Sequence, residues 1–262
     1  MDEHQVVEPA SETYFLVFES DQIYNVCSML HASELLDAAL ISRSWRGIAQ
    51  SDDLWKEKLK QQFPRFCFMD YVTPGRHRQL YLNSRTHEID GQAEPLWDEL
   101  RSHPFVGFET NSDRPLRSVA RKTQHDGCCS TAFGNQRFSS GQAYVEVVVD
   151  AFWDGYDESD HVDSVIMYVG VANAWSLPER AALCKSENGY GIACATGHIW
   201  HADDIIGTGL DVGVQSGHVL GIFIDFDSWD NQLRFSHQAR PCGDLNVELE
   251  TSVVVCVDLG FE

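Results

Sequence analysis

The sequence is short of positive charge. Its 262 residues include 19 Lys and Arg against 40 Asp and Glu, which gives a formal net charge of −21 at pH 7. A nucleic acid must be met by clusters of Lys and Arg, so we expect no nucleic acid as the main partner. The same shortage argues against a surface of anionic lipid, so we expect no membrane partner.

Long hydrophobic runs are also absent. Apolar stretches such as Val219–Ile224 and Val253–Val257 have the length of strands, whereas a membrane-spanning helix needs about 20 apolar residues. The acidic start Met1-Asp2-Glu3 lacks the basic and then apolar order of a signal peptide. The eight cysteines are dispersed, and with no export signal they indicate reduced thiols. We therefore expect the protein in the cytoplasm, the nucleus or both.

The first part of the chain has the period of helices. Ile23, Val26 and Leu30 lie at the spacing of one helix face. Apolar residues recur at helical spacing in three further segments, 35–40, 45–49 and 54–59. Such short helices bury little surface by themselves, so we expect the module to complete its core against a partner.

From about residue 104 the period changes to that of strands. Short apolar or alternating runs are separated by Gly, Asn, Asp and Ser, which is typical of an antiparallel sandwich or barrel. The runs are Tyr144–Val149, Val165–Val171, Tyr190–Ala195, Val219–Asp225, Gln232–Ser236 and Ser252–Leu259. We therefore predict an α+β multidomain chain. It has three to four short helices in residues 15–62, a linker with room for a helix in 63–103, and an antiparallel β-sandwich in 104–260.

The helical part resembles an F-box. Residues 41–55 read Ile-Ser-Arg-Ser-Trp-Arg-Gly-Ile-Ala-Gln-Ser-Asp-Asp-Leu-Trp. In the second half of an F-box, a hydrophobic pair, a polar residue, Arg, any residue, Trp and Arg precede an acidic turn and Leu-Trp. The opening departs from the family, because Phe18-Glu19 stand where Leu-Pro is usual and Gln22 stands where an apolar residue is common. The resemblance covers residues 18–59.

The second part resembles a SPRY domain, a concanavalin-like sandwich. Four family motifs occur in the expected order: the "SSGRHYWEV" strand, the "RVGVA" strand, a Gly/aromatic strand and the "VIGVxLDxDxxTLSF" hairpin. They correspond to Ser139–Val147, Tyr168–Ala172, Glu187–Ile192 and Val219–Ser236. The family usually adds a strand after the segment matched by Val253–Gly260. This leaves two alternatives: that strand is lost, or another segment completes the sheet.

An F-box followed by SPRY resembles the substrate receptors of SCF-type cullin–RING ubiquitin ligases. The resemblance implies a non-catalytic subunit. Its F-box docks on a Skp-type adaptor, and its SPRY loops hold a protein substrate for ubiquitination and proteasomal degradation. We expect no enzyme activity, catalytic residue, cofactor or metal. The alternative is a SPRY interaction scaffold outside a ligase, whose F-box-like segment works elsewhere or packs on the SPRY domain.

Docking on an adaptor needs a desolvated apolar face on short helices. The candidates are Phe18, Ile23, Val26, Leu30, Leu35, Leu36, Leu40, Trp45, Leu54 and Trp55. One helical stripe does not say which side faces a partner, so the same residues could instead form the module's own core.

The substrate-binding candidates lie on expected loops of the sandwich. By resemblance, Val119, Ala120 and Arg121 form one wall of a peptide pocket, and Asp258, Leu259 and Gly260 form another. Three aromatic residues in or beside expected loops are further candidates: Trp153, Tyr156 and Trp175.

Residues 83–262 hold 11 basic and 28 acidic side chains, a net charge of −17, and the stretch Asp150–Asp163 contains six acidic residues and no basic one. One hypothesis is that this stretch selects a basic motif in the substrate. The alternative is that it only keeps a surface loop soluble.

Overall fold

The computed structural model describes residues 18–84, 88–89, 92–93, 97–110, 118–123, 129–149, 167–177, 182–209, 213–228, 231–242, 249 and 252–260. The chain divides into two compact units, Met1–Leu54 and Trp55–Glu262. Within the described residues, no helix has the length and apolar content needed to cross a lipid bilayer.

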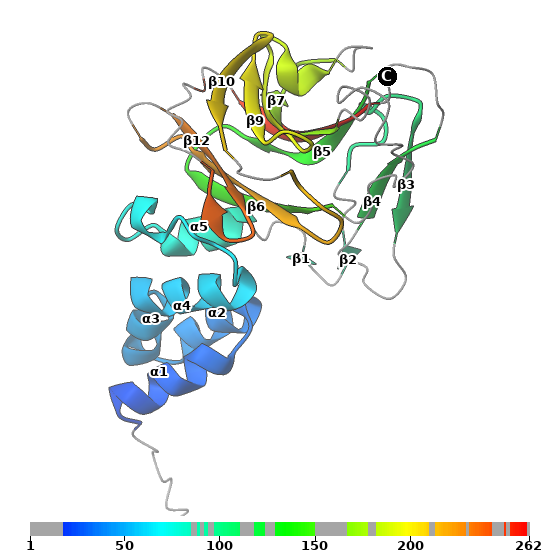
Figure 1. Ribbon diagram of the computed structural model, residues 1–262. Helices are drawn as coiled ribbons and strands as arrows, with labels where there is room; N and C mark the ends of the chain where they lie inside the picture. Colours follow the sequence, from blue (N-terminus) through cyan, green and yellow to red (C-terminus); the bar gives the residue numbers. More distant parts are fainter. Residues whose placement is uncertain are drawn as a thin grey trace, which may run out of the picture. The chain divides into compact units, whose positions relative to one another are not determined.

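The first unit is helical, as predicted. It contains α1 (Ser20–Met29), α2 (Ala32–Ile41) and α3 (Arg43–Ala49), and α4 (Asp52–Gln62) begins in it. Figure 1 shows these as short helices joined by tight connections. Both α1 and α2 pack against α3. The boundary predicted after residue 62 stays a prediction.

Local hydrogen bonds set where these helices begin. The backbone N–H of Glu19 donates to Oε1 of Gln22 at 3.1 Å, and the N–H of His31 donates to Oε2 of Glu34 at 2.7 Å. In both cases a side chain at the third helical position satisfies the capping residue's N–H, as in a capping box. The departure at Gln22 from the usual F-box opening thus serves to cap α1.

The second unit is built on two antiparallel sheets, which form two layers in Figure 1. The six-stranded sheet has the order β10-β9-β8-β7-β14-β5, and the four-stranded sheet has the order β13-β12-β11-β6. The six strands are Asp204–Thr208, His198–His201, Gly189–Ala193, Met167–Asn173, Val253–Leu259 and Ser130–Phe138. The four are Arg240–Pro241, Gln232–His237, Val219–Asp225 and Gln142–Val148.

Smaller elements complete the second unit. Two strand pairs stand apart from the main sheets, β1 (Glu88–Ile89) with β2 (Gln92–Ala93) and β3 (Val106–Thr110) with β4 (Ser118–Lys122). The 3₁₀ turns are η1 (Met69–Tyr71) and η2 (Leu183–Lys185). The helix α5 (His77–Ser84) lies within the segment predicted as a linker.

The main hydrophobic core lies between the two sheets. Because side chains alternate along a strand, Val253, Val255 and Val257 of β14 point into this core. Leu220, Ile222 and Ile224 of β11 belong to the same cluster. The predicted α+β fold class with a β-sandwich is confirmed.

All six predicted strand runs correspond to strands, and the predicted hairpin is β11 paired with β12, from Leu220 opposite His237 to Asp225 opposite Gln232. β14, the last predicted strand, pairs with β7 on one edge and β5 on the other. The sequence did not predict β5 or the β9–β10 hairpin.

Candidate functional site

Helix α2 is apolar on two sides. Leu35 and Ala38 are buried, whereas Leu36 and Leu40, one turn apart, are 53% and 75% exposed. Ile41 at the end of α2 and Met29 at the end of α1 are also exposed. Exposed apolar side chains gathered on one small module are typical of an interaction surface. We call Leu36, Leu40 and Ile41 the α2 surface.

The structure separates the ten predicted adaptor residues by exposure. Phe18, Leu36 and Leu40 are exposed, and Val26, Leu30 and Trp45 are half-buried. The Phe18 ring meets the Trp45 ring edge-on at 6.2 Å between centroids. The remaining four are buried: Ile23, Leu35, Leu54 and Trp55. The first three lie in the first unit, whereas Trp55 begins the second unit and its ring packs on Tyr81 of α5 at 5.2 Å between centroids. Met29 and Ile41 are exposed as well but were not among the predicted residues. Ile41 belongs to the hydrophobic pair of the F-box sequence pattern, so that pattern could have identified it.

In the second unit, the outer face of the four-stranded sheet is covered by the chain's own residues 63–84. Phe66 packs on Tyr144 of β6 at 4.8 Å between ring centroids, and Phe68 stacks on Phe223 of β11 at 5.5 Å. Arg234 of β12 lies over the ring of Tyr71 at 3.8 Å. Burial, followed by the nearby Glu146 carboxylate, raises the pKa of Tyr144, so its hydroxyl stays protonated.

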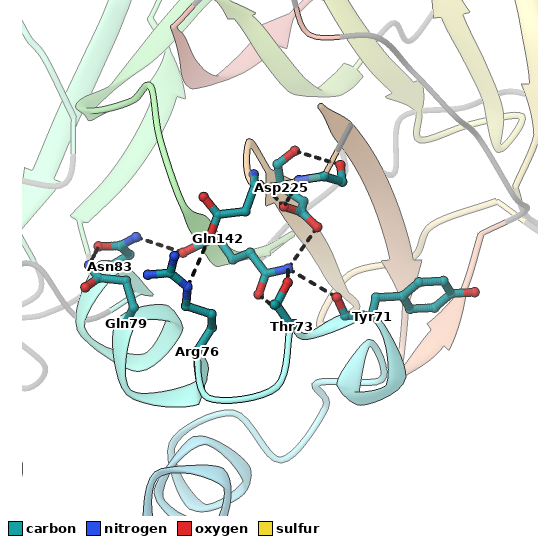
Figure 2. A network of polar contacts seen from close by, with 9 residues as sticks. Tyr71, Thr73, Arg76, Gln79, Asn83, Gln142 and Asp225 are labelled. Atoms are coloured by element: carbon teal, nitrogen blue, oxygen red, sulfur yellow. Dashed lines mark hydrogen bonds and ion pairs between the residues drawn. The ribbon is translucent and has the colours of Figure 1, made fainter. Parts of the chain in front are cut away.

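A network of polar contacts fixes this cover at the ends of β6 and β11 (Figure 2). The buried Gln142 donates from Nε2 to the Tyr71 carbonyl at 3.1 Å and to Oδ2 of Asp225 at 2.8 Å. Its Oε1 accepts from the N–H of Thr73 at 3.2 Å. Asn83 donates from Nδ2 to the Gln142 carbonyl at 2.8 Å. Gln142 of β6 thus joins η1 and β11 through its side chain and α5 through its backbone carbonyl.

Helix α5 protects the β6 edge of the four-stranded sheet. The N–H of Tyr144 donates to Oγ of Ser84 at 2.9 Å, beside the bond from Asn83. Exposed strand edges can pair with another chain, so covering one with a helix blocks such pairing. The edge is therefore blocked at Gln142 and Tyr144, the first half of β6.

Among the described residues, η2 covers part of the outer face of the six-stranded sheet. Phe133, Val254 and Cys256 form a second buried cluster with Leu183 and Cys184 of η2. An added Cβ at Gly191 of β8 would overlap Cys184, so this glycine lets η2 approach the sheet closely.

Asp258 takes part in this cover. Its carboxylate accepts hydrogen bonds from Oγ1 of Thr131 and from the N–H of Cys184. Burial raises the pKa of Asp258, and these two hydrogen bonds oppose the rise. The predicted substrate residues Asp258 and Gly260 are both buried. Because it has no exposed surface, Asp258 has a structural role in the sheet.

The remaining predicted substrate residues do not meet at one place. Leu259 ends β14 opposite Met167, whereas Trp175 lies just beyond the end of β7, where Asn173 pairs with Val253 at the start of β14. The two ends of β14 are about 20 Å apart, at roughly 3.3 Å per residue. Val119, Ala120 and Arg121 lie on β4, paired with β3. Trp153, Tyr156 and the acidic stretch 150–163 lie outside the described residues.

Trp175 is 71% exposed and stands beside a cation that the sequence did not single out. The guanidinium of Arg137, on β5, lies 4.6 Å from the centre of the Trp175 ring. This pairing was missed because the run that forms β5 does not alternate in hydrophobicity.

Residues 21–61 match the F-box-like family model. No curated protein matches the chain. The predicted order, an F-box-like module followed by an antiparallel β-sandwich, is confirmed. F-box-like modules are typically protein-interaction modules, so this match indicates an interaction role for residues 21–61.

Among solved structures, the chain is similar to three SPRY domains. The SPRY domain of human HERC1 is 11% identical, with a TM-score of 0.48, over 63% of this chain and 91% of that chain. The PSpry domain of TRIM65 is 18% identical, with a TM-score of 0.41, over 71% and 96%. A human SPRY domain is 14% identical, with a TM-score of 0.39, over 59% and 91%. At these values the similarity carries no conclusion about function.

Proposed function

We propose that the chain is a non-catalytic substrate receptor of an SCF-type cullin–RING ubiquitin ligase. In this proposal the F-box-like helices bind a Skp-type adaptor. The sandwich binds a protein substrate, which is then ubiquitinated and degraded by the proteasome. The chain contributes proximity, because holding a substrate near the ligase raises its effective concentration there. The proposed location is the cytoplasm, the nucleus or both.

The α2 surface is the observation that carries this proposal. A module whose second helix buries Leu35 but exposes Leu36 and Leu40 has apolar surface left over after its own core is formed. This surplus lies within residues 21–61, the segment that matches the F-box-like model. Burying such side chains against a partner is the main source of affinity in protein interfaces.

Binding of the full chain to a purified Skp-type adaptor tests the proposal. We expect a stable one-to-one complex with the unaltered chain. The double substitution Leu36→Glu and Leu40→Glu places two charges in the interface, so we expect binding at least about 30-fold weaker, which is the size of a hot-spot loss. Isothermal titration calorimetry gives both affinities.

The matched control is Leu82→Glu, which changes an exposed leucine of α5 in the second unit. It should bind the adaptor as the unaltered chain does. Circular dichroism verifies that each variant keeps its helices, so that lost binding is not lost folding. An unaltered, folded chain that does not bind the adaptor, while a known F-box protein does, contradicts the proposal.

The alternative function is an interaction scaffold outside a ligase, and the atypical opening at Phe18-Glu19 keeps it open. The two functions differ in how partner levels respond when the protein is removed. A receptor's bound partners should accumulate when the protein is depleted, whereas a scaffold's partners should keep their levels. Quantitative proteomics after depletion separates the two.

A further inference from the structure

The strongest unexplained feature outside the F-box-like module is the surface around Trp175 on the six-stranded sheet. The Trp175 side chain is 71% exposed, and Leu177 two residues later is equally exposed. Leaving a tryptophan in water forgoes the burial of a large apolar surface. Exposed aromatic side chains of this kind are frequent anchors in protein interfaces.

The Trp175 loop is held in place by its neighbours. The N–H of Trp175 donates to Oδ1 of Asn173 at 3.0 Å, and Arg101 donates from Nη2 to the Ser176 carbonyl at 3.0 Å. The Arg101 guanidinium itself lies over the buried Phe133 ring at 4.6 Å. A loop held in this way loses less conformational entropy when a partner binds, which favours binding at the exposed ring.

Arg137 supplies the charge at this surface. Its guanidinium stacks on the Trp175 ring, and among the residues that the structure describes no carboxylate pairs with it. The charges of Arg137 and Arg101 interact electrostatically. Burial lowers the pKa of Arg101, Asp98 opposes this, and Arg137 adds to the lowering. Arg101, which donates to the Ser176 carbonyl, and Arg137, which stacks on Trp175, thus place two guanidinium groups at this loop, within a part of the chain whose net charge is −17.

We propose that Arg137 and Trp175 bind an acidic segment of a partner protein. An Asp or Glu carboxylate of the partner would accept hydrogen bonds from the exposed edge of the Arg137 guanidinium. A neighbouring apolar side chain would pack on the Trp175 ring. Charge complementarity selects this occupant, because a basic segment would be repelled by Arg137 and Arg101. As an account of the substrate, this inference rests on the proposed function; as a binding site, it does not.

The surface differs from the pocket expected by resemblance. Trp175 lies where β14 begins. Leu259, which the SPRY resemblance places in a peptide pocket, lies where β14 ends. The acidic stretch 150–163 was the basis for expecting a basic substrate motif, so the two hypotheses predict opposite charges in the bound segment. Selecting binders from an unbiased set of peptides distinguishes them.

The test uses a random 12-residue peptide library displayed on phage and the full chain as the target. Counter-selection against the Arg137→Glu, Trp175→Ala double variant removes peptides that bind anywhere else. We expect the retained peptides to contain Asp or Glu next to an apolar residue. As synthetic peptides, they should bind Arg137→Gln about 10- to 100-fold more weakly, the usual loss for a charge-assisted hydrogen bond. Fluorescence anisotropy with a labelled peptide measures this.

The matched control is Arg240→Gln, an exposed arginine on β13 in the other sheet, and it should change affinity less than about twofold. Retained peptides that are basic, or an empty selection after counter-selection, would overturn the proposal. So would acidic peptides whose binding is the same for Arg137→Gln and Arg240→Gln. No adaptor is present in this experiment, so its failure is distinct from failure of the proposed ligase role.

Discussion

The two sheets of the sandwich differ in what covers their outer faces. Residues 63–84 close the outer face of the four-stranded sheet with stacked aromatic rings and the buried Gln142 network. The outer face of the six-stranded sheet is closed by η2 over its centre, while Trp175 at its end is exposed. Within the described part of the chain, one face is therefore closed, whereas the other leaves Trp175 exposed.

The difference between the sheets also locates a partner site by elimination. An edge and a face that already pack against α5 and Phe68 have little apolar surface to bury again. Binding is consequently expected at the six-stranded sheet and the loops beside it. Replacing a buried residue on the four-stranded face should therefore lower the free energy of unfolding more than replacing an exposed residue on the six-stranded face.

The largest effect should come from the aromatic cover. Phe68 is 1% exposed and stacks on Phe223, so Phe68→Ala should lower the free energy of unfolding of the second unit by about 3–5 kcal/mol. Trp175→Ala removes an even larger side chain, but an exposed one, and should change it by less than about 0.5 kcal/mol. Urea unfolding measures both values. Equal losses would mean that the two faces are not distinguished by burial.

The next effect should come from the polar network in Figure 2. Gln142→Leu leaves the Thr73 N–H and an Asp225 oxygen without their partner, so we expect a loss of about 2–3 kcal/mol. Gln79→Leu is the matched control, because Gln79 is exposed and bonds only Asn83 among the described contacts. It should be nearly neutral in the same unfolding experiment. A neutral Gln142→Leu would show that the aromatic rings alone hold the cover.

Two glycines, one on each sheet, lie where other residues approach the strand closely. An added Cβ at Gly221 would overlap the Tyr144 hydroxyl and Ser236, and one at Gly191 would overlap Cys184. Gly221→Ala and Gly191→Ala should each destabilise by about 1–3 kcal/mol, the usual range for overpacking. Gly47→Ala, in the open on α3, should instead stabilise its helix by about 0.5–1 kcal/mol. Thermal unfolding followed by circular dichroism compares the three melting temperatures.

The smallest effect should be a pH dependence from Asp258. Because burial raises its pKa in the folded state, the folded chain binds more protons than the unfolded chain between the two pKa values. This contribution to stability is complete below the unfolded value near 3.8 and is lost as pH rises through the folded value. Asp258→Asn should remove this slope. A wild-type and variant pair whose stabilities run parallel from pH 4 upward would show that Asp258 does not titrate this way.

The predictability of each element depends on its burial. β11 and β12 were predicted because their inner residues alternate with outer ones. β5 was not, because Ser130 to Gly134 are buried on both faces and leave no alternation to detect. The β9–β10 hairpin turns at Ala202 and Asp203 with φ of 50° and 64°. Glycine usually marks such a turn, and here it is absent.

The candidate site was predictable only in part. The F-box sequence pattern made Leu36 and Leu40 candidates for adaptor binding, and the structure shows that both side chains are exposed. The Arg137–Trp175 pair joins residues 38 positions apart, so no local pattern contains it. The cover of the four-stranded sheet likewise depends on long-range packing, although Phe66 and Phe68 alternate as residues on one face of an extended segment do.

The most direct test of two separate binding surfaces is a comparison of captured partners. Affinity capture and mass spectrometry are run on the unaltered chain, on Leu36→Glu with Leu40→Glu, and on Arg137→Glu with Trp175→Ala. We predict that the first variant loses the Skp-type adaptor and cullin but keeps its other partners. The second variant should keep adaptor and cullin and lose at least one other partner. Loss of the same proteins from both variants, or no adaptor with the unaltered chain, would contradict two separate surfaces with these roles.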